Sequence, residues 1–320
     1  MNRFVKATRR TAGGVLAAAT ALTMVGVRSG PAAAADATSL RASASDSVDW
    51  KAVDSAVGRP SVSQAGEVHR FNFPRTDLHV TVAGVEVKPA LALGGWVAMK
   101  PAGTGVIATG DLVLTEDEIN PVIITLQRGG IEQTAIHHHL LHETPRVYYM
   151  HVHAQGDPVK LGRTLRDAIA QTKVPPPSPP APATAIDLDT TAVAKALGHA
   201  GRINGGVYQV SVPRAEPITE HGMQLPPSMG LATAINFQPT GGGKAAITGD
   251  FVLTATEVNP VIRALTSHGI EVTSIHSHML EESPRLFFMH FWANDQASKL
   301  ATGLRAALDV TKSQKPPARC

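Results

Sequence analysis

The feature that most constrains this fold is an internal duplication. When each residue is placed over the residue 139 positions later, residues 110–154 align with residues 249–293 without a gap, and 25 of the 45 pairs are identical. The segment VHRFNFPR near the start of the first copy matches VYQVSVPR in the second. Because self-similarity on this scale marks repeated structural units, the chain must build one fold twice.

A proline-rich segment separates the two copies. It reads KVPPPSPPAPATA, and prolines at this density favour extended polyproline II over helix or sheet. We therefore expect a first repeat domain at 36–172, a semi-stiff linker at 173–185, a second repeat domain at 186–311 and a C-terminal tail at 312–320.

Residues 1–35 have the composition of an export signal peptide. A basic start, MNRFVKATRR, precedes an apolar stretch, and PAAAAD supplies small residues suited to cleavage near Ala35. Arg9 and Arg10 resemble a twin-arginine signal only weakly, so we expect Sec export and a secreted, extracellular protein. No lipobox-type cysteine follows the apolar stretch, so no lipid anchor is expected. The stretch is short and rich in Ala and Gly, so no stable membrane span is expected in the mature form.

Removal of that signal changes the charge of the protein. Residues 1–35 hold five of the 29 Lys and Arg and no Asp or Glu, so 24 basic residues remain against 26 acidic ones. That balance gives no sign of a nucleic-acid partner. The single cysteine, Cys320, excludes an intramolecular disulfide, so the fold must depend on its hydrophobic core, with a metal ion as an optional addition.

Each copy alternates helix and strand patterns. Thr115 and Glu118 form a capping-box pattern ahead of apolar residues at helical spacing, and Thr254 and Glu257 repeat it. Further on, IEQTAIHHHLL and RVYYMHVHA predict two strands around a HETP turn. We predict an α+β fold of two tandem homologous domains, each an antiparallel sheet packed against helices with a strand-helix-strand-strand-helix core.

The histidines are concentrated in this predicted hairpin. Nine of the fourteen lie within 137–153 and 276–290. Side chains alternate along a strand, so His137 and His139 point to the same side of their strand. On the returning strand, His151 and His153 likewise point to the same side as each other. Whether the two pairs lie on the same face depends on the parity of the turn, which the sequence leaves open.

The second copy separates shared histidines from variable ones. It replaces His138, His142 and His153 with other residues, so we treat these three as peripheral. Imidazole nitrogens suit Zn²⁺ or Cu²⁺ as a bound cofactor. The predicted metal ligands are the histidines that both copies share: His137, His139, His151, His276, His278 and His290.

Four charged residues accompany the shared histidines: Glu143, Glu282, Arg146 and Arg285. If the protein is an enzyme, the glutamates are the candidate general bases on metal-bound water, and the arginines would steady an anionic intermediate. Each arginine can instead pair with its neighbouring glutamate, which we favour, or bind a small anionic ligand. Asp111 and Asp250 follow glycines, and we expect them in turns.

The motifs GDLVLTEDEINPVI and HHHLLHETPRVYYMH, with their second copies, resemble the LppY/LpqO family of actinobacterial lipoproteins and exported proteins. The resemblance covers nearly the whole mature chain. It implies export and a tandem domain of unknown function, not a reaction. This chain differs from the lipoprotein members in lacking the cysteine that carries the lipid.

Three functions fit these patterns. The first is a secreted Zn- or Cu-binding protein with a His-X-His/Glu/His site in each repeat. The second is a metal-dependent secreted enzyme, a hydrolase or oxidoreductase, that uses the same site. The third is a cell-envelope binding module without metal. Because an imidazole has an ordinary pKa of about 6.5, the metal hypotheses predict that affinity falls below roughly pH 6.

Overall fold

The computed structural model describes residues 48–179 and 185–316. The predicted signal peptide, Cys320 and part of the predicted linker lie outside the described residues, and the domain boundaries remain predictions. The described residues belong to one compact unit, Ala44–Cys320, which contains both repeats. No helix in the described ranges is long and apolar enough to cross a membrane.

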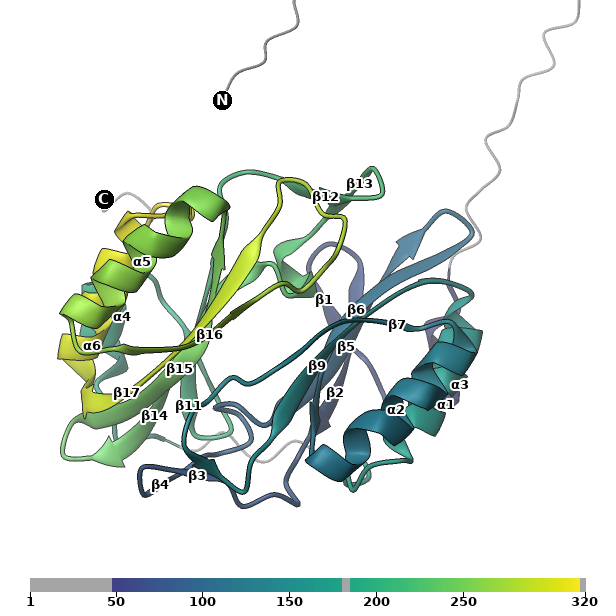
Figure 1. Ribbon diagram of the computed structural model, residues 1–320, viewed down its shortest axis with the longest axis horizontal. Helices are drawn as coiled ribbons and strands as arrows, with labels where there is room; N and C mark the ends of the chain where they lie inside the picture. Colours follow the sequence, from purple (N-terminus) through teal and green to yellow (C-terminus); the bar gives the residue numbers. More distant parts are fainter. Residues whose placement is uncertain (1–47, 180–184, 317–320) are drawn as a thin grey trace, which may run out of the picture. The chain divides into compact units, whose positions relative to one another are not determined.

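The first repeat forms a six-stranded antiparallel sheet with the strand order β1-β2-β5-β6-β9-β7 (Figure 1). Its strands are β1 (Val62–Gln64), β2 (Val68–Pro74), β5 (Gly94–Ala102), β6 (Gly105–Leu114), β7 (Glu132–His137) and β9 (Tyr148–Gly156). Its helices are α1 (Trp50–Val57), α2 (Glu116–Gly129) and α3 (Pro158–Ile169). A small sheet adds β3 (Thr81–Val82), β4 (Val85–Glu86) and β8 (Glu143–Thr144).

The second repeat has the same topology, with the order β10-β11-β14-β15-β17-β16. Its main strands are β10 (Arg202–Asn204), β11 (Val207–Pro213), β14 (Ala232–Gly241), β15 (Lys244–Leu253), β16 (Glu271–His276) and β17 (Phe287–Gln296). Its helices are α4 (Thr190–Leu197), α5 (Ala255–Ser267), α6 (Ala297–Asp309) and the short 3-10 turn η1 (Pro227–Met229). A separate hairpin is made by β12 (Ile218–Glu220) and β13 (Met223–Leu225). The predicted α+β fold of two tandem domains is confirmed.

The capping boxes define where α2 and α5 begin. The backbone N–H of Thr115 donates to Glu118 Oε2 at 2.9 Å, and that of Thr254 donates to Glu257 Oε2 at 2.7 Å. Glu118 also accepts a hydrogen bond from the buried guanidinium of Arg75 at 2.6 Å. This charged contact ties the start of α2 to the end of β2, and the second repeat has the equivalent pair.

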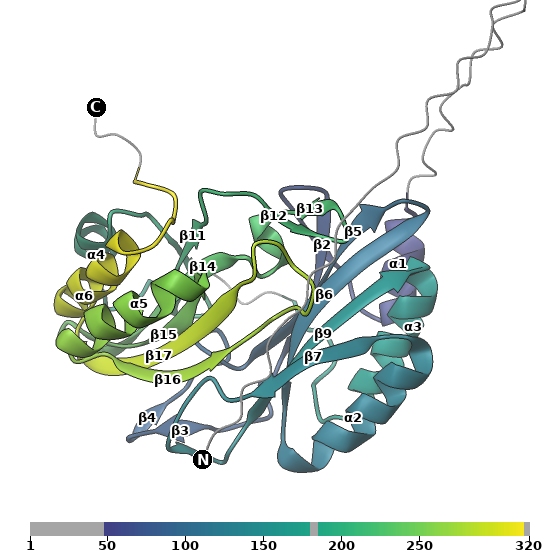
Figure 2. The same cartoon turned by 45° about the horizontal axis from the view of Figure 1, so that its top comes forward.

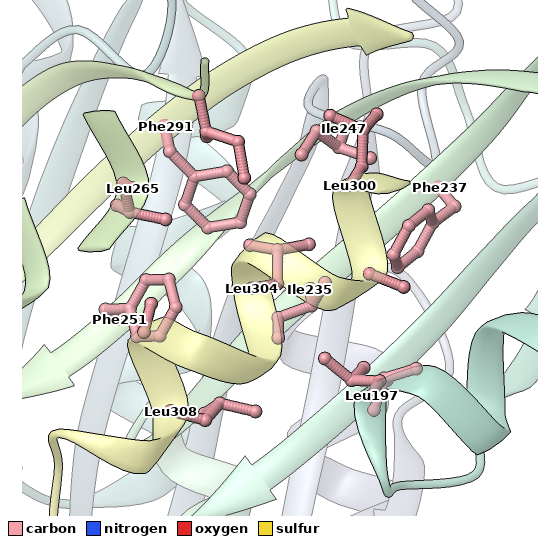
Figure 3. Close-up of a cluster of buried hydrophobic side chains, with 14 of the residues drawn as sticks. Leu197, Ile235, Phe237, Ile247, Phe251, Leu265, Phe291, Leu300, Leu304 and Leu308 are labelled. Atoms are coloured by element: carbon pink, nitrogen blue, oxygen red, sulfur yellow. The ribbon is translucent and has the colours of Figure 1, made fainter. Parts of the chain in front are cut away.

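The helices of each repeat cover one face of its sheet with a hydrophobic core. In the second repeat, leucines of α6 lie against aromatic and branched residues of the sheet (Figure 3). The labelled side chains are Leu197, Ile235, Phe237, Ile247, Phe251, Leu265, Phe291, Leu300, Leu304 and Leu308. Burial of this many large apolar side chains stabilises each repeat without a disulfide.

The other face of each sheet is turned toward the other repeat. On β9, Met150 and Val152 pack among the helices, whereas Tyr149 belongs to a core cluster that also contains Val207 and Trp292 of the second repeat. Adjacent residues of β9 therefore lie on opposite, equally buried faces. The resulting layers are helices, sheet, sheet and helices, as Figures 1 and 2 show.

Candidate metal centre

The six shared histidines of both repeats converge between the two sheets. They form three close ring pairs across the repeats. His137 and His276 are stacked with ring centroids 3.6 Å apart, His139 and His290 are stacked at 3.7 Å, and His151 and His278 are tilted at 3.8 Å. Each pair joins one residue of the first repeat to one of the second. We call these six residues the central cluster.

Strand alternation explains why the cluster faces the other repeat. His151 stands between Met150 and Val152 on β9, and both of those neighbours point into the helix-covered core. The imidazole must therefore point the other way. On β17, His290 stands between Met289 and Phe291 in the same manner. The turn parity that the sequence left open thus places His137, His139 and His151 together.

Two reciprocal hydrogen bonds hold the histidine-bearing segments against each other. The Thr134 hydroxyl donates to the carbonyl of His278 at 2.5 Å, and the Thr273 hydroxyl donates to the carbonyl of His139 at 2.6 Å. Thr134 and Thr273 are equivalent positions of the two repeats. The cluster is thus fixed by contacts between the repeats as well as within them.

Three groups of three histidines in this cluster could hold a metal ion. Within each group, one ligand atom from each residue lies within 4.8 Å of the others. One group lies within the first repeat, and the other two combine both repeats. The groups are His137 with His139 and His151, His137 with His276 and His290, and His151 with His276 and His278.

Hydrogen bonds to the backbone fix the tautomer of several of these histidines. Nδ1 of His151 lies 3.1 Å from the Gly110 carbonyl, and Nδ1 of His290 lies 2.7 Å from the Gly249 carbonyl. A carbonyl only accepts, so Nδ1 must carry the proton and Nε2 must present a free lone pair. In all six residues of the central cluster, Nε2 is buried without a hydrogen-bond partner.

Asp111 and Asp250 lie beside the central cluster. The expectation that they belong to turns is wrong. They lie within β6 and β15, directly opposite His151 and His290 on the neighbouring strands. Both are largely buried. The signal that would have found them is the repeated Gly-Asp followed by an apolar run, because the strand extends through it.

Each aspartate lies close to an imidazole of its own repeat. Asp111 Oδ2 is 3.4 Å from His139 Nε2, and Asp250 Oδ2 is 2.9 Å from His278 Nε2. Nδ1 of His278 already faces the Gly230 carbonyl at 3.2 Å, so its Nε2 carries a lone pair. A lone pair and a carboxylate oxygen at 2.9 Å repel each other unless a proton or a cation lies between them.

Burial keeps these imidazoles neutral. It is the main cause that lowers the pKa of every imidazole in the central cluster, and it lowers the pKa of His290 to about 3. Burial also raises the pKa of Asp250 and, together with the nearby Asp250, raises the pKa of Asp111 well above its ordinary value. Protons therefore compete for the imidazoles only at lower pH than the roughly pH 6 expected from the ordinary pKa.

The predicted catalytic glutamates and arginines are not in the groups of possible metal ligands among the described residues. Glu282 Oε1 accepts the backbone N–H of Leu286 at 2.8 Å, and its Oε2 lies 3.2 Å from Arg285 Nη1, the ion pair that we favoured. Glu143 lies on β8 with its Oε1 3.4 Å from His138 Nδ1, whereas Arg146 is exposed. These residues shape the turn that follows the first histidine pair.

The three variable histidines have three different environments. His138 faces the carbonyl of Val147 at 3.0 Å, and His142 is exposed. His153 is buried and lies 3.1 Å from Glu220 of the second repeat. No sequence pattern connects His153 with Glu220, because they are far apart in the chain and in different repeats.

Comparison with known proteins identifies the family of both repeats. A family model described as Domain of Unknown Function (DUF1259) matches residues 51–171 and 191–310. A comparison with curated proteins gave no match.

Two solved structures are similar at low scores. The trimeric bacterial microcompartment shell protein PduB is 12% identical, with a TM-score of 0.22, over 80% of this chain and 97% of that chain. EtuB from Clostridium kluyveri is 11% identical, with a TM-score of 0.18, over 78% of this chain and 91% of that chain. TM-scores this low support no inference about this chain.

Proposed function

The chain belongs to the DUF1259 family, and we propose that its two repeats jointly bind one zinc or copper ion between their sheets. The observation that carries this proposal is the set of six imidazoles in the central cluster, each with a buried Nε2 that has no hydrogen-bond partner. A buried polar atom without a partner costs about 1–3 kcal/mol. A metal ion would satisfy several of these atoms at once.

The chemistry of the ligands favours a borderline cation over a hard one. Neutral imidazole suits Zn²⁺ and Cu²⁺, whereas Mg²⁺ and Ca²⁺ prefer oxygen ligands. Hydrogen bonds from Nδ1 to backbone carbonyls, as at His151 and His290, are the usual outer contacts of a metal-binding histidine. Asp111 and Asp250 supply negative charge beside the cation.

The geometry favours one ion in the central cluster. Any two of its three possible ligand groups share one histidine: His137, His151 or His276. Where an imidazole offers a single lone pair, it cannot serve two ions, so the groups are alternatives. This differs from the separate site in each repeat that the sequence suggested. Two of the three groups take ligands from both repeats, and an ion bound by either of them would join the repeats.

We also propose that the protein acts outside the cell, as its N-terminal sequence suggests. The supporting features are the basic and apolar segments of residues 1–35 and the small residues before Asp36. N-terminal sequencing of protein recovered from culture medium should find a mature start near Ala35. Recovery of the full-length chain only from the cell interior would contradict export. Membership of the LppY/LpqO family stays a prediction.

Elemental analysis of untagged protein tests the metal proposal directly. After chelator treatment, the protein should take up Zn²⁺ or Cu²⁺ in a titration monitored with a competing chromophoric chelator. The double variant H137A/H276A should lose the central ion, because one of these two histidines belongs to every ligand group. His142→Ala is the matched control, since it removes an exposed histidine of the same hairpin.

Two results would overturn the proposal. One is a protein that is free of metal as isolated, takes up neither ion and melts at the same temperature with and without chelator. That result would favour the envelope-binding module. The other is equal uptake by wild type and H137A/H276A, which would place the bound ion elsewhere.

A further inference from the structure

A second cluster of possible ligands lies at the edge of the interface between the repeats. His153 projects from β9 of the first repeat, and Glu220 and His221 lie at the end of β12 in the second. One ligand atom from each of the three lies within 4.8 Å of the others. His153 is 7% exposed and Glu220 is 3% exposed, so two of the three side chains are removed from water.

The two buried side chains meet without forming a hydrogen bond. His153 Nε2 and Glu220 Oε2 are 3.1 Å apart, yet both atoms are buried and neither has a hydrogen-bond partner. The separation is close enough for a hydrogen bond, so the orientation of the groups is what excludes it. Ligands of a tetrahedral zinc ion, bound at 2.0–2.1 Å, lie roughly 3.3 Å from each other. The observed separation fits two ligands directed at a common ion.

The other side of the interface shows what this position looks like without polar ligands. The β3–β4 hairpin of the first repeat is equivalent to the β12–β13 hairpin of the second. Val82 pairs with Val85 as Glu220 pairs with Met223. The residues that follow, Ala83 and His221, both have a left-handed backbone, with φ of 47° and 49°. Glu220 thus takes the place of Val82, and His221 the place of Ala83.

The contacts across the interface differ in a concerted way. His153 of the first repeat is equivalent to Trp292 of the second. Trp292 shares a hydrophobic cluster with Val82, whereas His153 contacts Glu220. An apolar pair on one side is thus replaced by an imidazole and a carboxylate on the other. Two buried polar groups cost free energy unless something pairs with them.

A cavity of about 340 Å³ adjoins this second cluster. Besides the three ligands, it is lined by Glu132, Thr134 and Glu281, among other residues. Glu281 Oε2 lies 3.4 Å from His221 Nδ1, which places a second carboxylate at the rim. Two histidines and one glutamate are a ligand set of zinc sites that keep a position open for water or substrate.

We propose that His153, Glu220 and His221 form a second zinc site, independent of the central cluster, with one coordination position open to the adjoining cavity. The site exists on one side of the interface only, because the equivalent positions on the other side are Trp292, Val82 and Ala83. A water molecule or a small oxygen-donor ligand such as a carboxylate fits the open position.

Zinc titration of the untagged full chain tests this site. The double variant H153W/E220V restores the apolar pair of the other side and should bind one Zn²⁺ fewer per chain than wild type. His79→Ala is the matched control, because His79 also lies beside a glutamate, Glu86, but is exposed and belongs to none of the groups of possible metal ligands that the described residues form. The control should bind as many ions as wild type. Equal stoichiometry of wild type and the double variant would overturn the proposal.

A second variant keeps the test decisive if H153W/E220V does not fold. His221→Ala alters an exposed side chain and should weaken one zinc-binding step by at least about tenfold. Unchanged zinc affinity in that variant would overturn the proposal. H137A/H276A, measured in parallel, should lose the central ion and keep this one, so failure of either site is distinguishable from failure of the other.

Discussion

The interface between the repeats has the same residues from both repeats at its centre and different residues at its two edges. At the centre, both repeats carry the same three histidines and one aspartate. The histidines pair across the interface, His137 with His276, His139 with His290 and His151 with His278. At the edge, Trp292 and Val82 belong to one hydrophobic cluster on one side, whereas His153 lies against Glu220 on the other. The residues that both repeats share thus lie at the centre of the interface, where each repeat contributes the same side chains. The residues that differ lie at its edges, where each side has its own set.

At these equivalent positions, one side of the interface has apolar packing and the other has polar groups that can bind a ligand. Trp292 fills space among apolar neighbours and is 6% exposed. His153 is about as buried, but its Nε2 has no hydrogen-bond partner and lies beside the carboxylate of Glu220. The same strand position can therefore serve packing or ligand binding, depending on one partner residue in the other repeat.

The largest effect on stability is expected where packing dominates. Trp292→Ala should cost about 3–5 kcal/mol of the free energy of unfolding, because it leaves a cavity between the sheets. In metal-free protein, His153→Ala should cost less, since His153 Nε2 has no hydrogen bond to lose. Urea denaturation of both variants in the presence of chelator measures the difference. A larger cost for His153→Ala would show that its contact with Glu220 is a stabilising ion pair.

Ligand loss at the centre should affect both repeats alike. His137→Ala and His276→Ala should each lower the affinity for the central ion by roughly 100-fold. Loss of even an outer contact of a metal ligand lowers metal affinity by about 10–100-fold. Each of these residues belongs to two ligand groups, whereas His139 belongs to one, so His139→Ala should have the smaller effect. Competition titration with a chromophoric chelator gives the affinities. A strong effect in one repeat alone would contradict a jointly held ion.

Acid should destabilise the metal-free protein through the central imidazoles. Unfolded histidines bind protons near pH 6.5, whereas folded His290 does so only near about 3. Between these values the unfolded state binds more protons, so the free energy of unfolding falls as the pH falls. The decrease is up to about 1.4 kcal/mol per pH unit for each such imidazole. The raised pKa values of Asp111 and Asp250 act in the opposite direction, because these folded carboxyls retain protons that the unfolded ones release.

Denaturation at a series of pH values between 7 and 4, with chelator present, measures this slope. H137A/H276A removes two of the imidazoles and should have a shallower slope than wild type. A stability that does not change over this range would contradict the burial of neutral imidazoles.

The smallest effect is expected from the aspartates. Asp111→Asn and Asp250→Asn keep the shape of the side chain and remove its negative charge. Each should therefore lower the affinity for the central ion by about tenfold. The two losses should be similar, since the aspartates occupy equivalent positions opposite His151 and His290. Titration of the same metal into both variants makes the comparison. A stronger affinity in either variant would show that the buried carboxylates oppose binding.

Local sequence patterns were sufficient to predict the helices that follow the capping boxes, the two strands that carry the histidines and the histidines that both copies share. The capping boxes at Thr115 and Thr254 mark helix starts that the structure confirms. Alternation along β9 correctly grouped His151 with His153 on one face. Comparison of the copies selected the six histidines that converge. The error at Asp111 and Asp250 arose because a glycine suggested a turn where the strand continues.

The amino-acid sequence was enough to show that one fold occurs twice and which histidines both copies share, because these depend on short-range periodicity and on identity between the copies. That the two sets of histidines form one cluster, and that His153 lies beside Glu220, could be seen only in the three-dimensional structure. Both outcomes depend on how the buried faces of two sheets pack against each other. The alternation of a strand shows that a side chain points away from its helices, but not what it meets there.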